Sequence, residues 1–433
     1  MSPNSLKIDI KNIQDWKQKI LQFSLSFSHV AILDSCDEIH ANQLKEYDFL
    51  AAFGNKKSFH KNSQKFFEEL TEFTNNNWCF GYFAYDLKNQ IEDLNSSHND
   101  ITKFPYFSFF IPEIVITIKE NILEISAEKD SKNILDSLEN FSKIFNEKND
   151  NTFIEVKNFT EETPKKKYIA QVEKIKEHLA KGDIYELNFC IEMNADANIQ
   201  NPLFLFQELI SKSPAPFASF LKINEYYILS TSPERYLKKI GNTLYSQPIK
   251  GTSKRYQNKV ADEQSKKELL ASEKERAENV MIVDLVRNDL SRTCQPGTVN
   301  VDELFGIYSY THVHQMVSTI SGILEENYSG IDAIKNSFPM GSMTGAPKIS
   351  AMNLIEEYED TKRGAYSGAL GFFAPNGDFD FNVLIRSIFY NDTLKTIKTN
   401  AGSAITFDSE IEKEYEECLL KLAAMKDLLE KIH

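Results

Sequence analysis

Short β-rich runs alternate irregularly with helical segments along this chain, and that irregularity limits its possible folds more than any other feature. Residues 80–85 and 114–118 have the composition of strands and are separated by polar loops. One predicted helix has Thr163 as its N-cap and ends at Gly182, and another begins at Ser409. Because no regular strand–helix–strand repeat is present, the pattern predicts an α+β fold rather than a doubly wound parallel sheet.

A polar stretch divides the chain into two regions. Between about Glu128 and Lys165 the sequence has few apolar positions, which is typical of a surface helix followed by a linker. We therefore assign residues 1–150 to an N-terminal β-rich segment and residues 151–433 to a second region. With 433 residues and 41% apolar content, the chain is long enough to fill a sizeable core.

The charge balance excludes several classes of partner. The chain carries 49 basic and 63 acidic side chains, a net charge of −14, which repels nucleic acid and anionic membranes. An anionic ligand would therefore need a local cationic pocket. The first twelve residues lack the apolar stretch of a secretory signal, and the five cysteines have neither disulfide-framework nor zinc-site spacing. We expect a soluble cytoplasmic protein with reduced thiols.

The second region contains unusual segments in a fixed order. They are Ser232-Pro-Glu-Arg235, Pro248-Ile-Lys-Gly-Thr252, Arg276-Ala-Glu-Asn279 leading into Asp284-Leu-Val-Arg-Asn-Asp289, Gly341-Ser-Met-Thr-Gly-Ala-Pro-Lys348, Tyr366-Ser-Gly368, Ile385-Arg386-Ser387 and Asn400-Ala-Gly-Ser403. Together they resemble the chorismate-utilising enzymes, the family that includes anthranilate synthase component I, aminodeoxychorismate synthase component I, and isochorismate and salicylate synthases. The resemblance implies a fold like that of anthranilate synthase component I, with a large β-sandwich core and helices packed outside.

Lys250 occupies a position that discriminates within this family. The third residue of the Pro-Ile-x-Gly-Thr segment is usually alanine in anthranilate synthases and lysine in aminodeoxychorismate synthases. The resemblance therefore implies amination of chorismate to 4-amino-4-deoxychorismate, for 4-aminobenzoate and folate biosynthesis. The Lys250 amine would add at C2 as the C4 hydroxyl leaves, and ammonia would then enter at C4 and expel the lysine. Without the surrounding motifs, the same lysine would be interpreted as a solvated surface charge.

This reaction requires two shifted pKa values. A nucleophilic Lys250 must be neutral, so its pKa must fall by several units from about 10.4, which desolvation and a nearby cation can cause. The departing hydroxyl needs a proton, and the resemblance places the general acid at Glu234. The pKa of Glu234 must then rise from about 4.3 toward neutrality. The structural alternative is an ion pair between Glu234 and neighbouring Arg235.

Two pairs of glutamates recur at i, i+3 spacing on predicted helices: Glu275 with Glu278, and Glu414 with Glu417. Like charges on one helix face repel unless a cation neutralises them. Mg²⁺ prefers oxygen ligands and keeps several waters, so one carboxylate from each helix and a substrate carboxylate would form a site. The resemblance implies Glu278 and Glu417 as direct ligands, with Glu275 and Glu414 acting mainly through water. Such pairs also arise by chance on solvated helix faces.

Other motif residues are those that the resemblance assigns to chorismate binding. Arg386 would bind the enolpyruvyl carboxylate bidentately, and Tyr366 would donate a hydrogen bond to it. Backbone amides around Gly402 would reach the same group because glycine permits close approach. The full predicted set is Thr252, Thr344, Lys348, Tyr366, Arg386, Gly402 and Ser403.

The chain departs from the family pattern at two positions. Gln315 stands where the family usually has a histidine, three residues before Ser318. The neighbouring His314 would face the opposite side of a strand, and it is a candidate catalytic residue. Glu186 lies where ammonia-using members usually have glutamine and water-using members lysine, so it could orient or deprotonate ammonium. Isochorismate and salicylate synthesis are therefore less favoured.

The sequence also bears on regulation and partners. Leu33-Asp34-Ser35 resembles a segment that helps bind tryptophan in anthranilate synthase component I, and an ordinary strand end is the alternative. No cysteine lies in the glycine-flanked context of a glutaminase nucleophile, so a separate glutamine amidotransferase subunit would supply ammonia. Two other functions stay open: anthranilate synthase component I, which eliminates pyruvate, and a catalytically silent chorismate-binding subunit.

Overall fold

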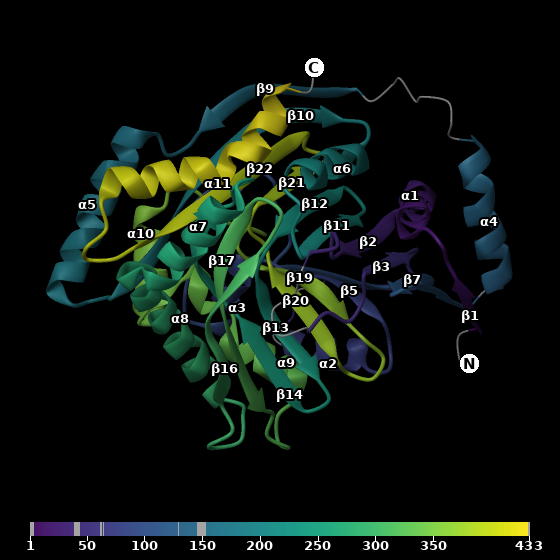
Figure 1. Cartoon of the computed structure of the whole chain (residues 1–433), viewed down its shortest axis with the longest axis horizontal. Coiled ribbons are helices and arrows are strands. Elements are labelled where there is room, and N and C mark those ends of the chain that lie inside the picture. The colour runs from purple at the N-terminus through teal and green to yellow at the C-terminus, as the bar shows by residue number, and fades with distance from the viewer. Residues whose placement is uncertain are drawn as a thin grey trace.

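The computed structural model describes residues 4–38, 44–60, 63, 65–128, 130–144 and 153–431. Within these ranges the chain forms two large antiparallel sheets with helices packed outside them (Figure 1). This arrangement confirms the predicted α+β class and the sandwich core.

The first sheet has twelve strands in the described part of the chain. They are Asn4–Asp9 (β1), His29–Asp34 (β2), Phe49–Phe53 (β3), Ile114–Lys119 (β7), Ile122–Ala127 (β8), Ile154–Glu161 (β9), Glu186–Ile199 (β10), Phe217–Ile223 (β11), Tyr226–Ser232 (β12), Gly345–Ala346 (β18), Ser387–Asn391 (β21) and Thr396–Ile405 (β22). Their order is β1-β8-β7-β3-β2-β11-β12-β21-β22-β10-β18, and β9 also pairs with β10. Strands from before residue 150 therefore meet strands from after it where β2 pairs with β11.

The second sheet has ten strands among the same residues. They are Lys57–Phe59 (β4), Cys79–Phe83 (β5), Phe107–Ile111 (β6), Arg235–Ile240 (β13), Thr243–Gln247 (β14), Ile249–Lys254 (β15), Asn300–Ser309 (β16), Val313–Ile323 (β17), Ala369–Phe373 (β19) and Phe379–Val383 (β20). Their order is β15-β17-β14-β13-β20-β19-β5-β6-β4, and β16 also pairs with β17. Both sheets therefore contain strands from before and after residue 150.

The α-helices of the described residues connect and cover these sheets. They are Ile13–Ser24 (α1), Phe66–Thr74 (α2), Lys88–Ile91 (α3), Ser131–Ile144 (α4), Lys165–Lys181 (α5), Pro202–Lys212 (α6), Lys259–Ala271 (α7), Glu273–Ser291 (α8), Gly330–Ser337 (α9), Lys348–Tyr358 (α10) and Ile411–Lys431 (α11). In Figure 1, α11 lies beside α5 over β22, and α7 and α8 lie against the end of the second sheet that contains β16 and β17. None of the described helices is both long enough and apolar enough to cross a membrane.

The helix ends follow the sequence signals only in part. Gly182 closes α5 with φ +82, as predicted, because glycine adopts the left-handed conformation without strain. The N-cap of α5 is Pro164 rather than Thr163, whose hydroxyl donates to Asp360 Oδ2 at 3.2 Å. The predicted start at Ser409 is also wrong by two residues, because the Ser409 hydroxyl bonds within the preceding loop and α11 begins at Ile411. The predicted linker is likewise wrong in part, since β9 pairs with β10.

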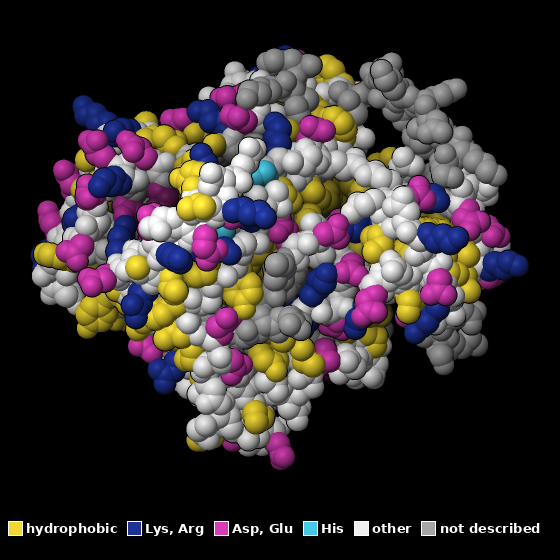
Figure 2. Space-filling view, in the orientation of Figure 1, with side chains coloured by type: hydrophobic (Ala, Val, Ile, Leu, Met, Phe, Trp, Pro, Cys, Tyr) yellow, Lys and Arg dark blue, Asp and Glu magenta, His cyan; other side chains and the backbone are white. Residues whose placement is uncertain are grey.

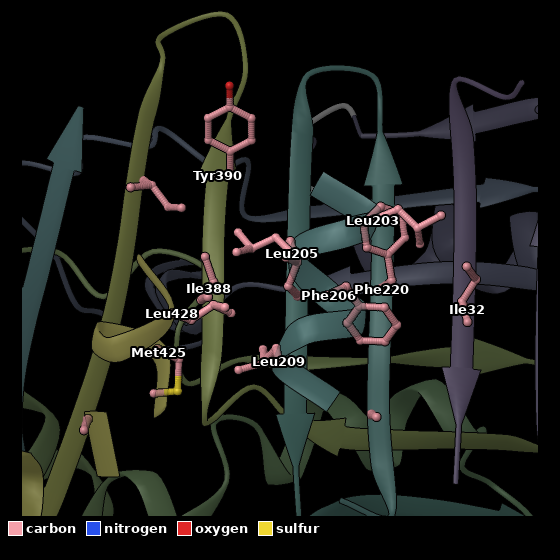
Figure 3. Close-up of a cluster of buried hydrophobic side chains, with 14 of the residues drawn as sticks. Ile32, Leu203, Leu205, Phe206, Leu209, Phe220, Ile388, Tyr390, Met425 and Leu428 are labelled. Atoms are coloured by element: carbon pink, nitrogen blue, oxygen red, sulfur yellow. The ribbon is translucent and has the colours of Figure 1, made fainter. Parts of the chain in front are cut away.

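Two apolar clusters occupy opposite faces of the first sheet. Ile32 and Ala31 are adjacent on β2, yet they belong to different clusters because successive strand side chains point to opposite faces. The cluster that contains Ile32 is covered by helices, as Figure 3 shows for α6 and α11. The labelled side chains that meet there are Ile32, Leu203, Leu205, Phe206, Leu209, Phe220, Ile388, Tyr390, Met425 and Leu428. The second cluster fills the space between the two sheets.

The cysteines lie mainly in the interior. Cys36 is partly exposed, and the other four are buried. On the face drawn in Figure 2, basic side chains are interspersed with acidic ones, so neither sign of charge dominates that face. An anionic ligand that approaches this face would therefore be recognised by particular side chains rather than by a broad basic surface.

Candidate active site

A β-bulge in β15 lies beside Lys250. The pairing of β15 with β17 shifts register between Ile249 and Thr252, and Gly251 adopts φ +94 within the shift. Glycine suits this position because its backbone is in the left-handed region, and because an added Cβ would approach the Glu275 carboxylate at 3.0 Å. The bulge therefore holds the backbone next to Lys250 close to α8.

The Lys250 ammonium is held between the two sheets. Its side chain is 13% exposed, and Nζ donates to Glu186 Oε1 at 2.8 Å. Burial alone would lower the pKa of Lys250, but the charges of Glu186, Glu278 and Glu234 outweigh burial and raise it above its ordinary value. The depressed pKa that we expected is therefore not found in this arrangement. Glu186 is the carboxylate placed to accept the proton of Lys250.

Glu234 lies between β12 and β13 and is 5% exposed. Burial raises its pKa to about 7, although the hydrogen bond from Ser342 and the charge of Lys250 oppose this rise. The Ser342 hydroxyl donates to Glu234 Oε1 at 2.6 Å. The alternative ion pair with Arg235 is not formed, because Arg235 pairs with Asp380 at 2.9 Å. Glu234 is thus a buried carboxyl group that can hold a proton near neutral pH.

The two pairs of glutamates face each other from α8 and α11. Burial raises the pKa of Glu278 to about 7, and Lys250 and Lys274 oppose this rise. Burial also raises the pKa of Glu275, and the charges of Glu417 and Glu414 add to the increase. Carboxylates from both helices therefore repel one another across a short distance.

Binding of Mg²⁺ by these glutamates stays a prediction. No three acidic, histidine or cysteine side chains among the described residues converge closely enough to enclose a metal ion. Mg²⁺ does not need such a cage, because it is commonly bound through one or two carboxylates, several waters and groups of the substrate. Glu278 lies on α8 and Glu417 on α11, so one carboxylate from each helix would be available to such a site.

Lys421 is a further charged residue of this site, and our sequence interpretation missed it. It lies on α11, where Nζ is 2.7 Å from Glu417 Oε1 and donates to the Gly402 carbonyl at 2.8 Å. Its charge also opposes the raised pKa of Glu234. The i, i+4 spacing of Glu417 and Lys421 was visible in the sequence, but the same spacing is common on solvated helix faces.

Arg386 is a partly exposed cation that has no ion-pair partner among the described residues. Burial lowers the pKa of its guanidinium, and no described carboxylate forms an ion pair with it. Its backbone is left-handed, at φ +49, and its carbonyl accepts from the Thr231 amide at 3.1 Å. Because this guanidinium is partly desolvated and its charge is not compensated within the described residues, it is suited to an anionic ligand.

Tyr366 and Gly402 meet around Cys190. The Cys190 thiol lies 3.8 Å from the Tyr366 hydroxyl, and Cys190 pairs with Gly402 across β10 and β22. A Cβ on Gly402 would lie 2.5 Å from Asn188 Oδ1, so only glycine fits. Asn188 Oδ1 is buried and accepts no hydrogen bond within the described structure. These contacts bring together two of the predicted substrate-binding residues.

The side chains of Ser403 and Lys348, which were also predicted to bind substrate, contact other residues of the protein. The Ser403 hydroxyl lies 3.1 Å from the hydroxyl of Tyr168 on α5. Lys348 Nζ forms an ion pair with Asp289 at 2.6 Å and donates to a backbone carbonyl at 3.0 Å. Lys348 thereby joins α10 to α8, and its charge is already compensated.

The two predicted threonines differ in exposure. The Thr344 side chain is fully buried, and its hydroxyl lies within hydrogen-bond distance of the carbonyls of Met340 and Gly341. Thr344 therefore shapes the loop that also carries Ser342. Thr252 is exposed on β15, two residues after Lys250.

His314 lies apart from this group, as the alternation of a strand requires. One ring nitrogen is 2.9 Å from the Ser309 hydroxyl, and the other is 3.0 Å from Asp262 Oδ1 on α7. One ring nitrogen therefore links β17 to β16 and the other links β17 to α7, so neither is free for a substrate. Gln315 is 2% exposed, and its Oε1 has no hydrogen-bond donor within the described residues.

The segment that resembles a tryptophan-binding sequence borders a separate hollow. The residues around this hollow include Leu33, Asp34, Ser35, Tyr47, Pro216, Phe217 and Arg235. Asp34 is already paired with Lys17, whose Nζ lies 2.7 Å from Asp34 Oδ1. Binding of tryptophan at this place stays a prediction.

Comparison with known proteins finds a matching family profile and relatives that are named for two reactions of chorismate. The sequence profile of a family described as chorismate binding enzyme matches residues 14–427. The chain is 35% identical over 441 residues to "Aminodeoxychorismate synthase, chloroplastic" of Arabidopsis thaliana, a match that covers 94% of this chain and 47% of that protein. It is 33% identical over 355 residues to "Anthranilate synthase component 1" of Saccharolobus solfataricus, with 80% of this chain and 79% of that protein covered.

The fold is shared with a solved structure of low sequence identity. The crystal structure of anthranilate synthase component I from Streptococcus pneumoniae TIGR4 matches with a TM-score of 0.72 at 21% identity. The match covers 99% of this chain and 93% of that chain. The chain thus spans nearly all of this solved structure, but about half the length of the Arabidopsis thaliana protein.

Proposed function

The chain belongs to the family of chorismate binding enzymes, and we propose from this premise that it aminates chorismate to 4-amino-4-deoxychorismate. The observation that carries the proposal is the position of Lys250, whose amine lies 2.8 Å from Glu186 within a group that includes the buried acid Glu234. Relatives named for anthranilate synthesis also match the chain. The choice between formation of 4-amino-4-deoxychorismate and formation of anthranilate therefore depends on the lysine at position 250.

Chorismate would be bound through its carboxylates. The guanidinium of Arg386 is partly desolvated and has no counter-charge among the described residues, so a carboxylate there would compensate it. Tyr366 lies near Gly402, whose missing side chain lets the Asn188 amide and the Cys190 thiol approach the backbone closely. These groups would fix the ring so that C2 and C4 face the reacting side chains.

Glu234 would protonate the departing hydroxyl. With a pKa raised to about 7, a useful fraction of Glu234 is protonated near neutral pH, whereas an ordinary glutamate would be almost wholly ionised. The proton would pass to the C4 oxygen as the C4–O bond breaks and water leaves. Ser342 would keep the Glu234 side chain oriented through its hydrogen bond.

Lys250 would act as the covalent nucleophile. Its ammonium would first pass a proton to Glu186, and the neutral amine would then form a bond to C2 as the ring double bonds shift toward C4. Ammonia would form a bond to C4 in the second half-reaction. The double bonds would return, the C2–N bond would break, and Lys250 would leave and regain its proton.

Glu278 and Glu417 would hold Mg²⁺, with Glu275 and Glu414 acting through water. When bound, the ion would neutralise a carboxylate of chorismate and reduce the negative charge that otherwise raises the pKa of Lys250.

The ammonia would come from a separate glutamine amidotransferase subunit in the cytoplasm. The product, 4-amino-4-deoxychorismate, would require another enzyme for conversion to 4-aminobenzoate in folate biosynthesis. A chain with this assignment should also use ammonium salts directly when the partner is omitted.

The test is an incubation of the purified chain with chorismate, Mg²⁺ and an ammonium salt, followed by separation and mass analysis of the products. We expect 4-amino-4-deoxychorismate without pyruvate. Fluorescent anthranilate with pyruvate would instead identify an anthranilate synthase component I. Chorismate binding in isothermal titration without either product would support a catalytically silent subunit.

A further inference from the structure

Lys274 bridges the two helices that carry the glutamate pairs. It is the second residue of α8, and its Nζ lies 3.4 Å from Glu414 Oε1 on α11. The same nitrogen is 3.8 Å from Glu278 Oε1, one helical turn along α8. The Lys274 side chain is 58% exposed, whereas the side chains of Glu278 and Glu414 are 13% and 5% exposed. One largely exposed ammonium group thus reaches two carboxylates that are mostly shielded from solvent.

Interactions within α8 alone do not explain why the Lys274 ammonium lies beside Glu278 and Glu414. Lys274 lies in the first turn of α8, where the helix dipole disfavours a positive charge. Its pairing with Glu278 has lysine on the N-terminal side, which is the weaker orientation of an i, i+4 pair. The attraction must therefore come from the carboxylates of both helices acting together. Their charges indeed raise the pKa of Lys274 although burial opposes the shift.

We propose that Lys274 is a built-in counter-ion that occupies the space between Glu278 and Glu414 and competes with the divalent cation for it. The proposal rests on the metal role of Glu278 within the proposed function. For a cation to reach Glu278, the Lys274 ammonium must swing toward solvent, and its exposure leaves that movement open. The lysine therefore weakens cation affinity while it stabilises the metal-free chain.

Lys413 offers a matched control. It lies on α11 and pairs with Glu410 at 2.7 Å, but both side chains are largely exposed, at 71% and 68%. Removing the Lys413 charge changes the net charge of the chain as much as removing that of Lys274. It leaves the contacts of Glu278 and Glu414 unchanged.

The experiment measures Mn²⁺ binding to the full chain by electron paramagnetic resonance, with Mg²⁺ competition, in the absence of chorismate. We expect Lys274→Met to bind Mn²⁺ about two- to tenfold more tightly than wild type, because one partly screened charge is removed. The metal-free Tm of this variant should fall by about 1–2 °C. Lys274→Arg and Lys413→Met should both stay near the wild-type affinity.

Unchanged or weaker Mn²⁺ binding in Lys274→Met would overturn the counter-ion role. Glu278→Gln serves as the separate check on the metal site. If Glu278→Gln leaves Mn²⁺ affinity at the wild-type value, the site assigned to Glu278 is wrong. If Glu278→Gln weakens binding and Lys274→Met does not strengthen it, only the inference about Lys274 fails.

Discussion

Lys398 and Lys250 are both lysines held beside carboxylates with little exposure to solvent. The pKa values of some nearby carboxyl groups, however, shift in opposite directions in the two places. Lys398 is fully buried and lies 3.0 Å from Asp100 and 3.3 Å from Glu192. The pKa of Asp100 is lowered by Lys398 although burial opposes the shift, so that pair stays charged. Around Lys250, burial instead raises the pKa of both Glu234 and Glu278 to about 7. One lysine belongs to an ion-pair network, and the other lies near two carboxyl groups that burial makes easier to protonate.

The contrast teaches that burial of a lysine does not by itself identify a reactive group. Lys398 also donates to the Lys362 carbonyl, so its three donors are used. The structure gives Lys250 one hydrogen bond, to Glu186. The neighbours that remain protonatable, rather than the lysine itself, distinguish the candidate active site.

Lys250→Ala gives the largest expected effect on activity. We expect formation of 4-amino-4-deoxychorismate to fall by about 10³-fold or more, since the covalent route is removed. Steady-state rates with ammonium salt as the nitrogen source measure the loss. The unfolding midpoint in urea should change little. Wild-type activity in this variant would contradict the nucleophile role.

Lys398→Met should affect stability instead. Removing one member of a buried ion-pair network leaves Asp100 and Glu192 uncompensated, at a cost of about 3–5 kcal/mol. Urea unfolding followed by circular dichroism measures this loss. If Lys398→Met unfolded like wild type but lost the amination activity, the proposed division between the two lysines would be wrong.

Glu234→Gln should slow the reaction without weakening the fold. The amide cannot protonate the leaving hydroxyl, so we expect kcat to fall by about 10²–10³-fold with a smaller change in KM. The alkaline limb of the pH profile that reports the general acid should also disappear. An unchanged profile would assign that limb to another residue.

Ser342→Ala gives the smallest effect, and its sign is the informative part. The Ser342 hydrogen bond favours the ionised form of Glu234, so its loss raises the pKa of Glu234 further above its ordinary value. The protonated acid would then persist to higher pH. We expect the alkaline limb of kcat/KM to move upward by up to about one pH unit. A downward shift would show that Ser342 does not act on Glu234 in this way.

The fold class could be predicted from the sequence because strand and helix signals are local. Gly182 marks the end of α5 for such a local reason, its left-handed backbone. The capping signal at Ser409 failed because the serine found partners within its own loop. The segment from Ile154 to Glu161 was interpreted as part of a linker, since pairing with β10 depends on residues far away in the sequence.

Only those residues of the candidate site that lie within the sequence motifs could be predicted from the sequence. The sequence motifs singled out Lys250 and Glu234, whose charges influence one another in the structure. They did not indicate the partner of Lys348, because Asp289 lies on another element. Lys421 was missed because an i, i+4 pair on a helix is usually solvated. The direction of the Lys250 pKa shift also depends on the distances to several carboxylates, and spacing along the chain does not supply those distances.

Intact-protein mass spectrometry tests the central role of Lys250 most directly. The chain is mixed with chorismate and Mg²⁺ without ammonia, and peptide mapping locates any modification. We predict an adduct with the mass of chorismate less one water on Lys250, absent from Lys250→Ala and discharged when ammonium is added. Rapid formation of 4-amino-4-deoxychorismate by a chain that never carries this adduct would contradict the account.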